Sequence, residues 1–322
     1  MSTGPLTQGS TLSLGHRATS VGIRLLTNVR EQPIPFLLVL GSLALFLSSY
    51  TSTLSSLIQR WNTDPNYSHG YLVPLVSLYL LHQSLERSSR RELSSPQGGH
   101  GVGSILVVAA ILLLWLTTLV PSLVLESFSM LVMILGAISI LFGRSLATRS
   151  IAPVAFLLFM VPWPSKLYSQ AAFPLQLAIS QTASVLLTML GIPVLCDGSL
   201  IHLPGQTMHV AEACSGMRQL TAFLAMGAAT ALMIERPTWV RGIILASAVP
   251  VAVLVNILRV TLMALMHHAG LGEWTKGTLH TLEGMIMIFA GFGILMGIMR
   301  VLDWIQVEPD PHPKTFDARV TA

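Results

Sequence analysis

The residues best suited to covalent chemistry lie in the segment Glu212-Ala-Cys214-Ser-Gly-Met-Arg218, directly before an apolar run. A cysteine at a helix N-terminus lies beside backbone amides that have no partner and at the positive end of the helix dipole, and both features lower a thiol pKa. Arg218, one helical turn further on, adds a positive charge. The spacing therefore predicts a nucleophilic thiolate at Cys214; the alternative is a small buried cysteine packed at a helix end.

A cation and an imidazole come from two other apolar parts of the chain. Asn256 and Arg259 share one helical face near the end of an apolar run, and a charge buried in hydrocarbon costs a few kcal/mol without a partner. His280, Glu283 and Gly284 share a face at the start of the last run. Taken singly, Arg259 is explained by snorkelling to the interface, and His280 by a satisfied interfacial histidine. Because the cysteine, the arginine and the histidine fall at the same expected depth, we interpret them as one site.

The composition indicates where such a site must lie. Of the 322 residues, 52% are hydrophobic and only 10% are charged, and the mean hydropathy is +0.69. A soluble globular chain carries about 25% charged residues, so soluble enzymes, secreted domains and fibrous proteins are excluded. The formal net charge of +4 comes from basic residues scattered between apolar runs. We attribute it to retention of loops in the cytoplasm rather than to nucleic-acid binding.

The apolar runs set the expected fold. About 20 apolar residues cross roughly 30 Å of hydrocarbon, and nine runs approach or reach that length. They are 36–58, 70–85, 102–120, 123–143, 151–161, 171–190, 216–234, 240–258 and 279–302. If the sixth run does not cross, the arginine-bearing loops and both termini become cytoplasmic. These arginines are Arg87, Arg90, Arg91, Arg144, Arg149, Arg236, Arg241 and Arg300. We therefore predict an all-α polytopic membrane protein with about eight transmembrane helices.

The sixth run, 171–190, has the pattern of an amphipathic helix. Polar side chains recur at helical spacing opposite an apolar face: Gln176, Ser180, Gln181, Ser184 and Thr188. We predict that this helix lies in the outer interface; the alternative is a ninth crossing packed through the polar stripe. The residues that follow contain turn signals around two short apolar strands, which predicts a short strand-like segment outside the membrane.

The two ends of the chain differ in composition from the membrane region. Residues 1–33 are rich in Ser, Thr and Gly and contain no aromatic residue, so they are expected to form a disordered cytoplasmic tail. Residues 34–303 form the expected membrane domain, and 304–322 the C-terminal cytoplasmic tail.

Four motifs together resemble one enzyme family. Glu212-Ala-Cys-Ser-Gly, Asn256-x-x-Arg259, His280-x-x-x-Gly284 and Tyr67-Ser-His-Gly-Tyr-Leu-Val-Pro occur in the order and with the spacings typical of the exosortases, over about residues 62–302. Exosortases are polytopic bacterial membrane proteins related to archaeosortases. The resemblance implies a cysteine transpeptidase of the bacterial cytoplasmic (inner) membrane. It would cleave C-terminal sorting signals of the PEP-CTERM type, which combine a Pro-Glu-Pro-like motif, a membrane helix and a basic cluster.

Carried over by position, the catalytic cysteine, arginine and histidine of the family correspond to Cys214, Arg259 and His280. Cys214 would attack a carbonyl at the outer end of the substrate helix, His280 would protonate the leaving amine, and Arg259 would stabilise the thiolate or the oxyanion. Glu283 would either orient the imidazole or be a carboxylate that the dipole at the start of the helix stabilises. Glu212 is expected to cap the helix or tune the thiol.

Several assignments stay open at this point. His69 also lies at an outer helix end and rivals His280 as the base; we assign it to substrate binding or packing. Arg218 is a candidate for reading an acidic residue of the sorting motif, and Asn256 for supporting Arg259. A disulfide between Cys196 and Cys214 would silence the nucleophile and leave an inactive scaffold.

The expected partners are membrane-anchored exported proteins with C-terminal sorting signals, together with the lipid bilayer, and no nucleic acid. No cofactor or metal is expected, and the His-Glu-x-x-His motif of metal-dependent proteases does not occur in the sequence. A transporter is the alternative outside enzymology, but its ionisable residues would lie near the bilayer midplane rather than at one surface.

Overall fold

The computed structural model describes residues 33–86, 99–210, 216–272 and 277–305. Both predicted tails lie outside the described residues except at their inner ends. The chain divides into two compact units, Met1–Leu54 and Ser55–Ala322. The described part of the first unit is the beginning of helix α2, where hydroxyls such as Ser49 donate to carbonyls of the preceding turn.

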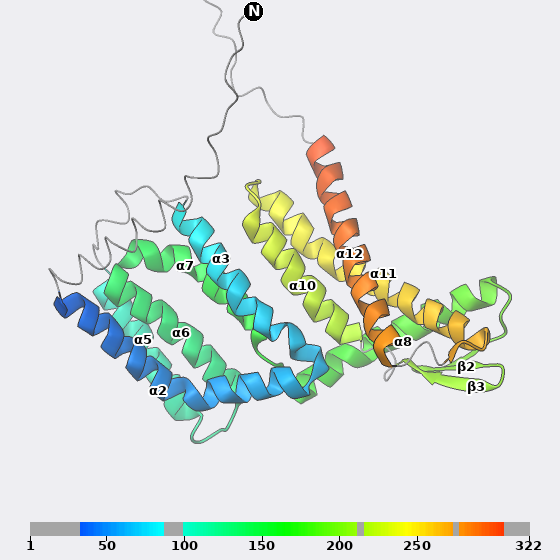
Figure 1. The fold of residues 1–322 in the computed structure, drawn as a ribbon, viewed down its shortest axis with the longest axis horizontal. Helices are drawn as coiled ribbons and strands as arrows, with labels where there is room; N and C mark the ends of the chain where they lie inside the picture. Colours follow the sequence, from blue (N-terminus) through cyan, green and yellow to red (C-terminus); the bar gives the residue numbers. More distant parts are fainter. Residues whose placement is uncertain (1–32, 87–98, 211–215, 273–276, 306–322) are drawn as a thin grey trace, which may run out of the picture. The chain divides into compact units, whose positions relative to one another are not determined.

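Nine α-helices occur among the described residues, and each overlaps one of the nine apolar runs (Figure 1). They are α2 (Pro33–Thr63), α3 (Leu72–Glu86), α5 (His100–Leu116), α6 (Leu123–Phe142), α7 (Arg144–Phe156), α8 (Ser165–Met189), α10 (Gly216–Met233), α11 (Thr238–His268) and α12 (Gly277–Ile305). Two 3₁₀ helices, η1 (Pro65–Tyr71) and η2 (Leu157–Met160), follow α2 and α7. Four of the described helices are long and apolar enough to cross a membrane, namely α6, α8, α11 and α12 within 123–142, 166–189, 238–268 and 282–305. A polytopic membrane protein is consistent with this, whereas the number eight stays a prediction.

Helices α5, α6 and α7 pack as consecutive neighbours. A Cβ at Gly103 would lie 2.6 Å from Ile140 Cγ1, so α5 and α6 approach each other closely at this glycine. Helix α7 begins directly after Gly143, whose φ of 86° turns the chain without a loop. Arg144 and Arg149, which we expected in the loop after the fourth run, therefore lie within a helix.

Helices α10, α11 and α12 form a second group, seen side by side in Figure 1. Phe223 of α10 packs in a core cluster with Val251, Ala252 and Val255 of α11 and with Leu295 of α12. A Cβ at Gly227 would lie 2.8 Å from Ala248 Cβ. Residue numbers fall along α10 as they rise along α11 in these contacts, so the two helices are antiparallel neighbours.

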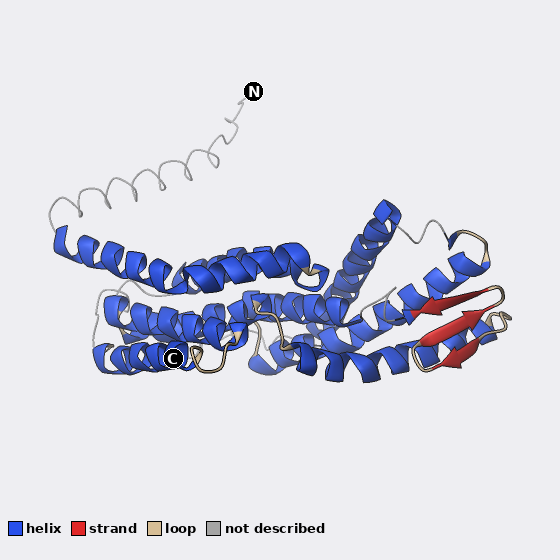
Figure 2. Ribbon diagram, turned by 90° about the horizontal axis from the view of Figure 1, so that it is seen from below, coloured by secondary structure: helices blue, strands red, loops and turns tan. Residues whose placement is uncertain are grey.

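Helix α8 packs against the C-terminal part of α11 and a small sheet (Figure 2). The sheet is antiparallel with strand order β1 (Leu195–Asp197), β2 (Leu200–Leu203) and β3 (Gln206–His209). Gly198 (φ 60°) and Gly205 (φ 83°) form its two turns. We predicted two strands here, and the structure has three, because residues 195–197 before the first turn also pair.

The apolar face of α8 is buried by this packing. Ile179, Ala183 and Leu187 are fully buried with Ile201 of the sheet and Val260 of α11. Two members of the polar stripe are also buried, and Ser180 donates to the Gly198 carbonyl at 2.7 Å. Whether α8 crosses the membrane or lies at its surface is not decided by this packing, since its length and composition satisfy a crossing.

Candidate functional site

Two charged pairs lie along the antiparallel helices α11 and α12. Just before the start of α11, Arg236 Nη2 lies 3.1 Å from Asp303 Oδ1 of α12; in the last third of α11, Arg259 Nε lies 3.6 Å from Glu283 Oε1. Arg241 and Arg259 are 18 positions apart on α11, which corresponds to about 27 Å at 1.5 Å per residue. This separation is close to the roughly 30 Å thickness of the hydrocarbon core. The Arg259–Glu283 pair therefore lies about one membrane thickness from the arginines at the other end.

The Arg259–Glu283 pair is buried between the two helices. Their side chains are 8% and 14% exposed, so water screens the interaction only weakly. A Cβ at Gly284 would lie 3.8 Å from Arg259 Nη2, which places this glycine against the guanidinium. The structure thus joins three residues of two predicted motifs, and it places the Glu283 carboxylate on Arg259.

Two carboxamides are buried close to this level. Asn256, one turn before Arg259 on α11, is 1% exposed, and Gln219, at the start of α10, is 4% exposed. In the described part of the chain, neither carboxamide has a hydrogen-bond partner. Sequence reasoning missed Gln219. The available signal was its spacing of four from Phe223 and eight from Gly227, which places a polar residue on an otherwise apolar helical face.

Arg218 connects α10 to the 3₁₀ helix η1. Its Nε donates to Asn66 Oδ1 at 3.4 Å, across 152 positions of sequence. The side chain of Asp64 caps η1 by accepting from the Asn66 amide at 3.0 Å, and it also accepts from Asn66 Nδ2 at 2.9 Å. Asn66, a residue we did not predict, therefore holds Arg218 at the start of α10.

The Tyr67-Ser-His-Gly motif packs η1 against η2 and the residues after it. Tyr67 Oη accepts from the Trp163 amide at 2.9 Å, and Trp61 Nε1 donates to the Met160 carbonyl at 2.9 Å. A side chain at Gly70 would overlap the Trp61 indole. Burial raises the pKa of Tyr67, so its hydroxyl stays neutral.

His69 has main-chain contacts on η2. Its Nε2 lies 3.2 Å from the Phe159 carbonyl, which can only accept, so this nitrogen carries the proton. Burial lowers the pKa of His69, and hydrogen bonds with the main chain at Phe159 and Asn66 partly oppose that shift. These contacts hold the His69 ring against η2, and its role in substrate binding or packing stays a prediction.

Three of the predicted residues cannot be placed. Glu212 and Cys214 lie outside the described residues, with Cys214 two positions before the first residue of α10 in the sequence. His280 belongs to α12, three positions before Glu283, but its side chain is not described. Cys196 on β1 is a free thiol, and its Sγ lies 3.5 Å from the Gly198 carbonyl.

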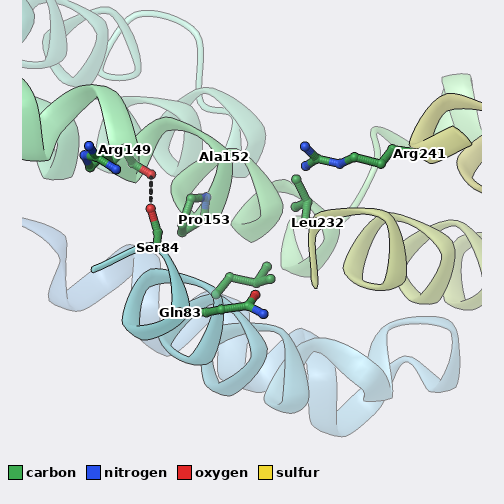
Figure 3. A pocket seen from close by; sticks show the side chains of 8 residues that line it. Gln83, Ser84, Arg149, Ala152, Pro153, Leu232 and Arg241 are labelled. Carbon is green, nitrogen blue, oxygen red and sulfur yellow. Dashed lines mark hydrogen bonds between the residues drawn. The ribbon is translucent and has the colours of Figure 1, made fainter. Parts of the chain in front are cut away.

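A cavity of about 160 Å³ lies far from this site (Figure 3). Its lining includes Gln83 and Ser84 of α3, Arg149 of α7 and Arg241 of α11. Because Arg241 lies about one membrane thickness from Arg259 along α11, the cavity does not contact Arg259. Within the described ranges, no group of three or more His, Cys, Asp or Glu side chains is arranged to hold a metal ion.

A model of a known protein family matches most of the chain. The model described as transmembrane exosortase matches residues 61–297. The chain belongs to the transmembrane exosortase family. The match includes the η1 motif, Cys214, Arg259 and His280, which is the region in which the exosortase motifs were recognised. Neither the curated proteins nor the solved structures contain a match to the chain.

Proposed function

We propose that this exosortase is a membrane cysteine transpeptidase that cleaves C-terminal sorting signals of the PEP-CTERM type. The observation that carries the proposal is the buried Arg259 of α11, which lies beside Glu283 of α12, three positions after His280 in the sequence. In the sequence, Cys214 directly precedes α10, and α10 packs against both of these helices. The family match supports the same assignment.

The proposed reaction has two steps. The Cys214 thiolate attacks the scissile carbonyl, the C–N bond breaks, and His280 protonates the leaving amine, which leaves a thioacyl enzyme. An amine or hydroxyl of an envelope acceptor, or water, then attacks the thioester and restores the thiol. Arg259 stabilises the oxyanion of each tetrahedral intermediate, a contribution typically of about 3 to 4 kcal/mol.

Burial of Arg259 strengthens this electrostatic role. Its guanidinium has several N–H donors; the carboxylate of Glu283 lies 3.6 Å from Nε, and Nη2 lies against Gly284. Glu283 fixes the orientation of the guanidinium before substrate arrives. Because the side chain is only 8% exposed, the field at a developing oxyanion is stronger than it would be in water.

The substrate brings its own membrane helix. A protein confined to the bilayer by that helix arrives at a defined depth, which lowers the entropic cost of positioning the scissile bond. The proposal locates the enzyme in the bacterial cytoplasmic membrane, with the active site on the extracytoplasmic face and both termini in the cytoplasm. The arginines near the other ends of α10, α11 and α12 support this orientation.

The free thiol of Cys196 bears on the inactive-scaffold alternative. That alternative requires a bridge between Cys196 and Cys214; among the described residues, Cys196 Sγ lies 3.5 Å from the Gly198 carbonyl of its own turn. The transporter alternative predicts charged side chains at the middle of the helices, whereas the Arg259–Glu283 pair lies in the last third of α11 and the first third of α12.

The test is co-expression with a tagged protein that carries a PEP-CTERM-type signal. We expect Cys214→Ala, Arg259→Ala and His280→Ala each to leave full-length substrate in the membrane, whereas the matched Cys196→Ala enzyme processes it normally. Normal processing by Cys214→Ala would refute the proposed function.

A further inference from the structure

The helix register brings the two buried carboxamides to the same level along α10 and α11. Gly227 of α10 approaches Ala248 of α11, and Phe223, one turn earlier, packs at the level of Ala252. One more turn back on α10 and forward on α11 pairs Gln219 with Asn256, since residues four apart share a helical face. Figure 1 shows α10 and α11 side by side from the turn that joins them.

Both carboxamides have unused hydrogen-bonding groups. Gln219 and Asn256 are 4% and 1% exposed, and in the described ranges their oxygen and nitrogen atoms have no partner. Burial of an amide without a hydrogen bond is unfavourable, and two adjacent ones are rare in a helix interface. Leucine at either position would fill similar space at no such cost. The arrangement therefore needs a reason other than stability.

The position of the pair suggests its ligand. Asn256 lies one turn from Arg259, on the side of Arg259 toward the middle of α11. A peptide bond inside a substrate helix is engaged in helical hydrogen bonds, so the helix has to unwind around the bond that is cleaved. Unwinding at membrane depth exposes main-chain N–H and C=O groups that have no water to bind.

We propose that Gln219 and Asn256 bind the main-chain N–H and C=O groups of the substrate that are freed on the membrane side of the scissile bond. Each carboxamide offers one acceptor and one donor group, which complement a peptide group of any sequence. The pair is thus a substrate-binding subsite that tolerates different residues in the membrane helix of the substrate. This inference rests on the proposed function, because it requires a peptide substrate that enters beside Arg259.

The test uses the full-length enzyme in nanodiscs with a purified, tagged PEP-CTERM-type substrate. We expect Gln219→Leu and Asn256→Leu to lower kcat/KM by about tenfold or more, the effect of losing one or two hydrogen bonds to substrate, while the melting temperature stays equal or rises. In a Cys214→Ala background, Gln219→Leu is expected to weaken capture of intact substrate by a similar factor. The matched control is Thr230→Val. Thr230 lies near the C-terminal end of α10, away from Gln219, and donates to the Met226 carbonyl of its own helix at 2.9 Å.

Other outcomes overturn the inference. Wild-type kcat/KM in both leucine variants would show that the carboxamides do not bind substrate. A loss of cleavage with a lower melting temperature in both variants would assign the two residues to the fold. Failure of the proposed function is recognised separately, because Cys214→Ala would then cleave substrate whatever the Gln219 variant does.

Discussion

Arg259 of α11 and Glu283 of α12 form a buried ion pair with 3.6 Å between Nε and Oε1. The pair links α11 and α12 by opposite charges in addition to their packing. A buried pair of this kind contributes little net stability compared with apolar residues, but loss of one partner leaves an uncompensated charge. Removing one charge and removing both should therefore affect stability differently, and this difference allows the effect of the pair on stability to be measured separately from its effect on catalysis.

Removal of one charge is expected to destabilise the protein more than removal of both. Arg259→Met should lower the free energy of unfolding by about 3 kcal/mol, because the Glu283 carboxylate is then buried without its cation. The double variant Arg259→Met/Glu283→Met should recover most of that loss and still cleave no substrate. Thermal melting of the purified proteins measures the first effect and substrate processing the second. Equal melting temperatures of the single and double variants would contradict the pairing.

The two cysteines are expected to differ in reactivity. Maleimide labelling of intact cells at pH 7 should modify Cys214 faster than Cys196, because Cys214 precedes a helix with Arg218 in its first turn, while Cys196 lies on a strand with its thiol at a carbonyl. Labelling of Cys196→Ser and Cys214→Ser variants separates the two rates. A faster reaction at Cys196 would argue against an activated Cys214. The expected protection of Cys214 by bound substrate gives a second check.

His69 is expected to make the protein less stable in acid. Its pKa is lower in the folded protein than in the unfolded chain, where a histidine titrates near 6.5, so the stabilisation is complete above about pH 6.5 and is lost as the pH falls below that value. His69→Gln keeps an N–H donor for the Phe159 carbonyl but cannot be protonated. The drop in melting temperature between pH 7.5 and pH 5.5 should therefore be smaller in His69→Gln than in wild type. An identical drop in both proteins would show that His69 is not the group that titrates.

The helices could be predicted from the sequence because each apolar run needs its backbone hydrogen bonds satisfied within the segment. The residues at which the helices end were harder to predict. The apolar run 240–258 predicts a helix that ends near Arg259, but α11 continues to His268, because Val260, Met263 and Ala264 pack against α8 and the sheet. Packing outside the run thus sets the end of the helix.

The partners of the site residues could not be predicted. The sequence places Arg259 and Glu283 near the same surface, but the contact between them depends on how α11 and α12 rotate about their axes. The same holds for Arg218 and Asn66, which are 152 positions apart. Gln219 shows a second limit. A glutamine directly after Arg218 is expected on a polar surface, and only the contacts of Phe223 and Gly227 with α11 show which face of α10 is buried.

Gly291 of α12 is expected to be required by the Phe223 ring of α10. A Cβ at Gly291 would overlap that ring, whereas a Cβ at Gly293 has nothing within 4 Å. Alanine favours a helix over glycine by up to about 1 kcal/mol, but forced overpacking typically costs about 1 to 3 kcal/mol. Gly291→Ala should therefore lower the melting temperature, and Gly293→Ala should leave it equal or raise it.

A second substitution tests whether the ring is the cause. Leucine at position 223 removes the part of the side chain that meets the new methyl group, so Phe223→Leu should cost stability in the wild-type background and much less in Gly291→Ala. Phe223 lies one helical turn after Gln219 on α10. Displacement of its ring in Gly291→Ala should therefore also reduce substrate processing. Recovery of both stability and processing in the double variant would tie them to this one contact. Additive losses in the double variant would instead show that Gly291 and Phe223 act independently.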